Sequence, residues 1–264
     1  MITNWIITGD CHGKVNRFDS YTYPRDGTVG IIILGDAGIN YYLNKSDNKV
    51  KEKLQNSGYK FYLVRGNHEA RPEDVPGVSY VYDEEVKGNV GLDEKYPAIH
   101  YFIDGYSYDI DGHPCLVIGG AYSIDKNYRL SRGYPYIWFE NEQLTPEERE
   151  SILKKVKGQK YDFIFTHTCP RSWEPTDLFL NSIDQDTVDK SMEDWLDEVK
   201  DAITFQVWLF GHFHADRIER FGVEQYYLYN ETLSDIWNRW SDLKGWEYEM
   251  RPPYRNYSFR MESV

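Results

Sequence analysis

The 264-residue chain lacks a hydrophobic run long enough to cross a membrane. The apolar run near its start, residues 5–7, ends before Gly9-Asp10, and no basic leader or small-residue cleavage site accompanies this run. The chain has only three cysteines, Cys11, Cys115 and Cys169, with no CxxC pair. This number and spacing argue against a disulfide framework and a zinc ribbon. We therefore expect a cytoplasmic protein with reduced, buried thiols.

Positive charge is also scarce. The chain has 30 Lys and Arg residues and 43 Asp and Glu residues, which gives a net charge of −13. The balance argues against a nucleic-acid coat protein, and it disfavours a long nucleic acid as substrate, since binding of that polyanion depends on Lys and Arg. Hydrophobic residues make up 41% of the chain, enough for a sizeable core and too many for a disordered protein.

Short apolar runs of strand length recur along the chain, and several end abruptly at Gly, Asp, Asn or His. The runs are residues 5–8, 29–34, 59–64, 115–118, 163–166, 207–210 and 226–229. Helical segments are predicted between them at 47–57, 145–157 and 187–203, the second with Thr145 as N-cap and Glu148 completing a capping box. This alternation indicates an α/β fold, in which ligands bind beyond the carboxyl ends of the strands.

Two segments depart from the alternation. Residues 71–113 contain short aromatic runs at 78–82, 99–103 and 106–110, which predict an antiparallel portion within the same body. Near the end, five apolar residues follow helical spacing: Leu233, Ile236, Trp237, Trp240 and Leu243. We expect residues 1–264 to form a single domain, with 231–264 a Trp- and Tyr-rich C-terminal extension packed on it.

Five short motifs end the apolar runs and contain five of the seven histidines. They are Gly9-Asp10-Cys11-His12-Gly13, Gly35-Asp36-Ala37-Gly38, Arg65-Gly66-Asn67-His68-Glu69, Thr166-His167-Thr168-Cys169-Pro170 and Gly211-His212-Phe213-His214. A mixture of Asp, Asn and His suits divalent metals of borderline softness, so the motifs predict a metal site. Any one of these residues, taken alone, is more often a turn or hydrogen-bonding residue.

Residues two apart in an extended segment point the same way. Extended motifs would therefore present Asp10 with His12, and His212 with His214, while Cys11 turns away. Ligands drawn from positions 10 to 214 require a single sheet structure, which favours one catalytic domain.

The ordered set D-x-H, G-D, G-N-H-[DE], H and G-H-x-H resembles the calcineurin-like metallophosphoesterases. The resemblance implies a two-sheet mixed β-sandwich flanked by helices, and two divalent metal ions of Mn, Fe or Zn type. The first metal would take Asp10, His12 and His214, the second Asn67, His167 and His212, with Asp36 bridging them. A metal-bridging hydroxide would attack the phosphorus of a phosphomonoester or phosphodiester. His68 would be the catalytic residue, as general acid or transition-state donor at the leaving group, with an orienting role as the alternative.

Substrate-binding candidates lie near these motifs. Arg65 occupies a position at which the family's protein-phosphatase branch has a phosphate-binding arginine, although the second motif here lacks that branch's Asp and Arg. A loop over residues 119–129 supplies Lys126 and Arg129 as possible phosphate contacts, against the alternative of a solvated loop. We expect a small phosphorylated molecule or nucleotide as substrate; a metal-dependent nuclease, a serine/threonine-type protein phosphatase and a non-enzymatic scaffold are the alternatives.

Overall fold

The computed structural model describes residues 1–220, 224–229 and 232–234. Residues Met1–Ser234 form one unit by their contacts. The expected C-terminal extension falls outside the described residues except for strand β13 (Thr232–Ser234). The helix predicted from Leu233 onward is therefore wrong at its first residue, because β13 pairs antiparallel with strand β1. The rest of that prediction, Ile236 to Leu243, lies outside the described residues.

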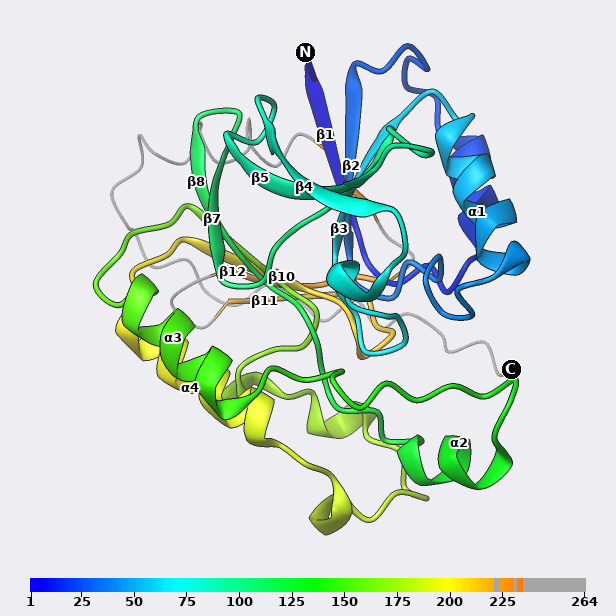
Figure 1. The fold of residues 1–264 in the computed structure, drawn as a ribbon. Coiled ribbons are helices and arrows are strands. Elements are labelled where there is room, and N and C mark those ends of the chain that lie inside the picture. The colour runs from blue at the N-terminus through cyan, green and yellow to red at the C-terminus, as the bar shows by residue number, and fades with distance from the viewer. Residues whose placement is uncertain (221–223, 230–231, 235–264) are drawn as a thin grey trace. The chain divides into compact units, whose positions relative to one another are not determined.

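Seven strands form the first sheet, in the order β13-β1-β2-β3-β6-β5-β4 (Figure 1). They are β1 (Asn4–Thr8), β2 (Val29–Leu34), β3 (Lys60–Val64), β4 (Val78–Asp83), β5 (Gly88–Asp93), β6 (Ile99–Tyr101) and β13. Strands β1, β2, β3 and β6 run parallel, whereas β13, β5 and β4 pair antiparallel. The sequence did not predict β5, because Gly88, Asn89 and Gly91 have low strand propensity.

Six strands form the second sheet, in the order β11-β12-β10-β9-β8-β7. They are β7 (Tyr106–Ile110), β8 (His113–Ile118), β9 (Phe163–Thr166), β10 (Val207–Phe210), β11 (Arg217–Arg220) and β12 (Glu224–Tyr227). Its four central strands are parallel, and β7 and β11 are antiparallel edges. Both sheets are thus mixed, with a parallel centre.

Helices cover the outer faces of both sheets (Figure 1). Helix α1 (Lys45–Gln55) lies on the first sheet, while α3 (Pro146–Val156) and α4 (Ser191–Ala202) pack against each other on the second. The expected capping box opens α3, a feature worth about 1 kcal/mol. Short 3₁₀ helices occur at Val15–Ser20, Pro72–Asp74, Arg171–Trp173, Thr176–Leu178 and Gln185–Thr187. None of the helices in the described part of the chain is long and apolar enough to cross a membrane.

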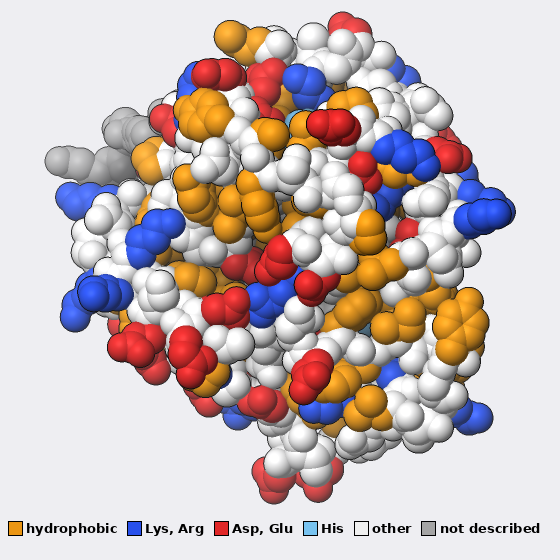
Figure 2. Space-filling model, viewed as in Figure 1, with side chains coloured by type: hydrophobic (Ala, Val, Ile, Leu, Met, Phe, Trp, Pro, Cys, Tyr) orange, Lys and Arg blue, Asp and Glu red, His pale blue; other side chains and the backbone are white. Residues whose placement is uncertain are grey.

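Helix α2 (Lys126–Arg132) stands apart from the other helices (Figure 1) and was expected as a loop. It has no buried residue, so no apolar stripe marks it in the sequence. Figure 2 shows hydrophobic side chains gathered on the lower right of the visible face, where Figure 1 places α2. Tyr128 and Leu130 of this helix are exposed.

The central strands are buried on both faces, which explains their unbroken apolar sequence. In β2, Ile31 and Ile33 pack in one core cluster with Leu54 of α1, while Ile32 between them points to the opposite face and is equally buried. Trp208 of β10 packs in a second cluster with residues of α3 and α4. The layers are helix, sheet, sheet and helix, which is the α/β two-sheet mixed sandwich expected.

Candidate metal centre

The predicted ligands follow the carboxyl ends of five central strands. Asp10 and His12 follow β1, and Asp36 follows β2. Asn67 follows β3, His167 follows β9, and His212 and His214 follow β10. Within each sheet the parallel strands end at a common edge. Strands β1, β2 and β3 belong to the first sheet and β9 and β10 to the second, so the ligands from position 10 to position 214 come from two sheets and not from the single sheet expected.

The first group of side chains comprises Asp10, His12 and His214, whose ligand atoms lie within 4.8 Å of one another. The Nε2 atoms of the two histidines are 2.9 Å apart. Asp10 Oδ2 lies 3.2 Å from His214 Nε2 and 3.8 Å from His12 Nε2. The Asp10 carboxylate is buried, whereas the side chain of His214 is 49% exposed, so the group opens to solvent on the His214 side.

The second group surrounds Asp36. Its Oδ2 atom lies 3.6 Å from His167 Nε2 and 3.9 Å from His12 Nε2, and therefore faces both groups. His167 Nδ1 donates to the carbonyl of Leu34, so the lone pair of Nε2 points at Asn67 Oδ1, 2.8 Å away. Burial alone would raise the pKa of Asp36, but the neighbouring histidines outweigh it and hold that pKa well below its usual range.

His212 is the last of the seven predicted ligands. Its ring centroid lies 5.1 Å from that of His167, and its backbone N–H donates to Asp10 Oδ1. Burial and the neighbouring His167 lower its pKa well below the usual imidazole range, which favours the neutral form that ligates metals. The structure thus brings all seven predicted ligands together.

The expectation of extended motifs was wrong, although the side chains converge. His12, Asp36, His212 and His214 all have left-handed backbone conformations, with φ between 44° and 65°. Turns, rather than alternation along a strand, aim these side chains. Cys11 does turn away from the group, as expected, and burial raises its pKa to about 12.

Two glycines allow the carboxylates to approach the backbone. A Cβ atom at Gly66 would lie 1.9 Å from Asp36 Oδ1, and one at Gly211 would lie 2.2 Å from Asp10 Oδ1. Both distances are far below van der Waals contact, so each carboxylate occupies the space that a side chain would need. The glycines of the G-N-H and G-H-x-H motifs are therefore steric requirements of this site.

Arg17, which the sequence did not single out, holds the turn that carries Asp10. Its guanidinium donates to the carbonyls of Gly9, Asp10 and Tyr229 at 2.7, 3.3 and 2.8 Å. It also donates to Thr8 Oγ1 and to the sulfur of Cys11. This one side chain therefore joins the end of β1 to the segment after β12.

His68 lies at the edge of the two groups. Its Nε2 atom is 3.9 Å from Asp36 Oδ2, and its backbone N–H donates to Asp36 Oδ1. Burial lowers its pKa, with the Asp36 charge opposing that effect. The next residue, Glu69, accepts a hydrogen bond from the backbone N–H of Gly66, so it has a structural role in this turn.

Two residues that the sequence did not identify as functional, Ser123 and Glu142, fix the amide of Asn67 through its nitrogen. Its Nδ2 donates to Ser123 Oγ at 2.8 Å, and that hydroxyl donates to Glu142 Oε2 at 2.5 Å. Ser123 N also donates to Glu142 Oε1, at 2.9 Å. All three side chains are buried. Ser123 lies in the segment expected to line the cleft, but nothing in the sequence marks Glu142.

Arg65, one of the substrate-binding candidates, is buried and bonded to other parts of the protein. Its side chain is 2% exposed, and its three nitrogens donate to Asp104 Oδ2 and to the carbonyls of Gly119 and Glu142. Since every nitrogen is engaged, the guanidinium supports the segments that bear Ser123 and Glu142 and leaves no face free for phosphate.

Lys126 and Arg129 both lie in the segment of α2. The Arg129 guanidinium pairs with Asp125 and donates to the hydroxyl of Tyr41 and the carbonyl of Ile137, so most of its hydrogen-bonding capacity is used. The Lys126 ammonium lies 4.2 Å from the centroid of the Trp138 ring. These contacts place both cations in the packing of the arm around α2.

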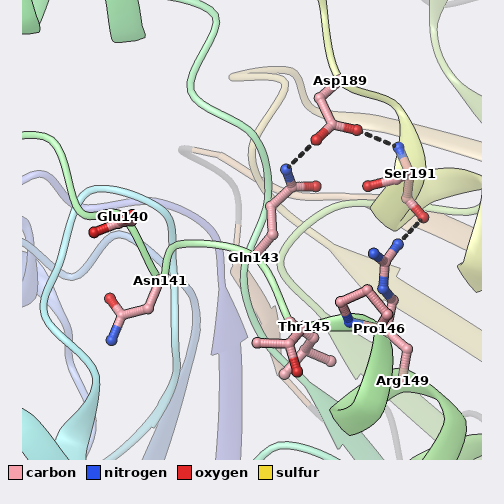
Figure 3. A pocket seen from close by; sticks show the side chains of 9 residues that line it. Glu140, Asn141, Gln143, Thr145, Pro146, Arg149, Asp189 and Ser191 are labelled. Atoms are coloured by element: carbon pink, nitrogen blue, oxygen red, sulfur yellow. Dashed lines mark hydrogen bonds between the residues drawn. The ribbon is translucent and has the colours of Figure 1, made fainter.

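A surface cavity of about 590 Å³ lies at the N-terminal ends of α3 and α4 (Figure 3). It is lined by Glu140, Asn141, Gln143, Leu144, Thr145, Pro146, Arg149, Asp189 and Ser191, and thus by none of the predicted ligands. Gln143 donates to Asp189 in this cavity, while its neighbour Glu142 turns to Ser123.

The donor atoms fit divalent cations. His167 Nε2 and Asn67 Oδ1 are both acceptors in the bonding pattern described, yet they face each other at 2.8 Å. His12 Nε2 and His214 Nε2 also face each other, at 2.9 Å, and both can ligate a cation once neither carries a proton. A cation between such lone pairs removes their repulsion, and a set of carboxylate, imidazole and amide donors suits Mn, Fe or Zn.

Comparison with known proteins identifies the family of the chain. The family model of calcineurin-like phosphoesterases matches residues 4–216. Among solved structures, the chain is similar to phosphopantetheinyl hydrolase (PptH) from Mycobacterium tuberculosis, with 14% identity, coverage of 86% of this chain and 89% of that chain, and a TM-score of 0.42. No curated protein matches significantly. The family match spans all five motifs, and the chain therefore belongs to the calcineurin-like phosphoesterases, metal-dependent hydrolases of phosphoesters.

Proposed function

We propose that the protein uses two divalent metal ions to hydrolyse a phosphomonoester or phosphodiester of a small molecule or nucleotide. The position of Asp36 Oδ2, 3.9 Å from His12 Nε2 and 3.6 Å from His167 Nε2, carries this proposal. One carboxylate oxygen that faces two donor groups is what a pair of adjacent cations needs as a shared ligand.

The ligand sets follow from the two groups. Asp10, His12 and His214 would hold one ion, and Asn67, His167 and His212 the other. When bound, such ions supply Lewis-acid stabilisation of phosphoryl oxygens and lower the pKa of a coordinated water.

The remaining steps of the reaction depend on side chains of the protein itself. His68 lies beside Asp36 with its side chain 22% exposed, so it can reach both the donor groups and a substrate from solvent. We assign it the donation of a proton to the leaving oxygen through Nε2. The exposed side of His214 and His12 is where the substrate enters, because the donors from β2, β3 and β9 are buried.

The position of Arg65 counts against a protein phosphatase of the type in which this arginine binds phosphate. Its guanidinium is buried, and each of its three nitrogens donates a hydrogen bond within the protein. Of the alternatives, a nuclease would need Lys and Arg along a polyanion, which the net charge of −13 disfavours. A small substrate fits both observations.

The test is hydrolysis of p-nitrophenyl phosphate beside bis(p-nitrophenyl) phosphate, after chelation and after return of Mn²⁺, with Asp36→Asn as control. We expect turnover of at least one ester that depends on the metal and is lost in the variant. The preferred ester then distinguishes a monoesterase from a diesterase. Two bound ions without turnover of either ester, of a nucleotide or of a phosphopeptide would contradict the proposal.

A further inference from the structure

The amide of Asn67 is oriented by a chain of hydrogen bonds outside the five motifs. Only the oxygen of an Asn amide can ligate a cation, so the choice between its two orientations decides whether Asn67 is a ligand at all. Asn67 Nδ2 donates to Ser123 Oγ, which leaves Oδ1 facing His167 Nε2. The amide is therefore set by the direction in which Ser123 donates.

A hydroxyl carries one hydrogen, and Ser123 gives it to Glu142 Oε2 at 2.5 Å. The backbone N–H of Ser123 donates to the other carboxylate oxygen at 2.9 Å. Both oxygens of Glu142 thus act as acceptors for one residue, which is the pattern of an ionised carboxylate. With its hydrogen committed, Ser123 Oγ can only accept from Asn67.

Arg65 fixes the backbone of Glu142. Its carbonyl accepts from Arg65, and the same guanidinium donates to the carbonyl of Gly119, before Ser123 in the chain. Glu142 and Ser123 therefore join the two ends of residues 124–141, the arm that contains α2. Because the side chains of Asn67, Ser123 and Glu142 are 1–3% exposed, little water reaches them to replace a lost partner.

We propose that Glu142 is a positioning residue that acts through Ser123 to hold Asn67 Oδ1 as a cation ligand, and that it thereby couples the α2 arm to the second metal position. This inference rests on the proposed function, since it assumes that Asn67 binds a cation. It also assigns a role to a carboxylate that lies far from the motifs in sequence.

The isosteric substitution Glu142→Gln gives the sharpest test, because it reverses the hydrogen-bond direction without changing shape. The backbone N–H of Ser123 can only donate, so it must keep the Gln oxygen as its acceptor. The Gln NH₂ group then faces Ser123 Oγ and donates to it. The Ser123 hydrogen turns to Asn67, whose amide must rotate to accept it, and Nδ2 replaces Oδ1 at the cation position.

Removal of the hydroxyl should be less harmful than its reversal. Ser123→Ala removes the 2.8 Å partner of Asn67 Nδ2 and leaves that nitrogen only its longer contact to His68 Nε2, at 3.4 Å, but it adds no group that favours the reversed amide. In the double variant Glu142→Gln/Ser123→Ala, no hydroxyl remains to transmit the reversal. The double variant should therefore bind the second cation more tightly than Glu142→Gln alone.

The measurement is titration of the metal-free full chain with Mn²⁺ by calorimetry, with electron paramagnetic resonance to distinguish one bound ion from a coupled pair. Residues behind metal ligands typically change affinity about 10- to 100-fold. For Glu142→Gln we expect one of two ions to bind on the order of 10- to 100-fold more weakly, and for Ser123→Ala a smaller loss. Glu140→Gln, which changes an exposed carboxylate two residues earlier, is the matched control and should bind both ions as the wild type does.

Each result bears on the inference. Unchanged affinity in both Glu142→Gln and Ser123→Ala, or a double variant weaker than Glu142→Gln, would overturn it, since a purely structural role gives losses that add up. If Glu142→Gln does not fold, unchanged binding by Ser123→Ala alone overturns it. A wild type that binds fewer than two ions would instead refute the proposed function, and a wild type that binds two ions while Glu142→Gln equals Glu140→Gln would refute only this inference.

Discussion

The Nε2 atoms of His12 and His214 lie 2.9 Å apart, although 202 positions separate the residues in the chain. Two neutral imidazoles at this distance must share a proton or repel each other through their lone pairs, whereas a cation satisfies both. The contact arises because β1 and β10, in different sheets, end at the same site. It links the fold directly to the chemistry proposed for it.

Cation binding should weaken as the pH falls. The hydrogen bond to Asp10 raises the pKa of His214, and this histidine must lose its proton to become a ligand. Affinity for Mn²⁺ is therefore expected to be full above that raised pKa and to decrease as the pH drops through it, with protons released on binding. Calorimetry at pH 6 and pH 8 in buffers of different ionisation enthalpy measures both effects, and equal affinity without proton release would contradict the assignment of His214.

Asp36→Asn should remove the shared ligand. Residues behind a metal site are worth about 10- to 100-fold in affinity, so loss of a ligand common to both ions should exceed about 100-fold. The variant keeps an amide oxygen that can accept from the backbone of His68, so the fold should be retained. Metal content after dialysis, beside the unfolding temperature, distinguishes the two effects; two retained ions would show that Asp36 does not bridge them.

His68→Ala should separate catalysis from metal binding. The side chain is not among the proposed ligands, and a general acid contributes about 10²- to 10⁴-fold to rate. We expect kcat to fall by that order while both ions remain bound. The fall should be larger for an alkyl phosphate than for p-nitrophenyl phosphate, because a poor leaving group needs its proton more. An equal loss of metal in His68→Ala and Asp36→Asn would refute this division of roles.

Arg17→Lys tests the support of the first donor group. One ammonium cannot replace the guanidinium that serves three carbonyls, a hydroxyl and the Cys11 sulfur. We expect binding of the first ion to weaken by about 10- to 100-fold. Cys11→Ser is the matched control, since a hydroxyl still accepts from Arg17 and the side chain faces away from the site. Mn²⁺ titration of both variants checks the prediction, and similar losses in the two would place Cys11 in the site.

Glu193→Gln should flatten the dependence of stability on pH. Burial raises the pKa of Glu193 from 4.5 to about 7, with the hydrogen bond from Thr168 opposing it. The native state therefore holds a proton that the unfolded state releases, and stability falls by about 1.4 kcal/mol per pH unit as the pH rises from about 4.5 to about 7. Above about pH 7, Glu193 is ionised in both the native and the unfolded state, so the loss of stability no longer increases with pH.

The neutral variant avoids this cost, so at pH 8 it should be more stable than the wild type. Urea unfolding at pH 5 and pH 8 measures the difference for both proteins. Glu69, with a pKa raised to about 8, contributes in the same direction in both and thus cancels in the comparison. Equal pH dependence in the two proteins would show that Glu193 does not titrate in this range.

The amino-acid sequence by itself determined most of the strands, the capped helix α3 and the identity of the seven clustered donor residues. These features are local: an apolar run predicts a buried strand, Thr145 and Glu148 lie three residues apart, and each motif directly follows its strand. Strand β5 escaped prediction because pairing with β4 and β6, rather than its own residues, decides its structure. Helix α2 escaped it because none of its residues is buried, so no apolar stripe marks it.

Only the tertiary structure decided which residues surround the donors. Arg65 looked like a phosphate ligand by its place in a motif, but its guanidinium is buried among Asp104 and two carbonyls that come from distant segments. Glu142 has no signal in the sequence, because its role depends on meeting Ser123 and, through it, Asn67. Spacing along the chain identifies groups that follow one strand, whereas the orientation of an amide or a guanidinium depends on atoms that only folding brings within hydrogen-bond distance.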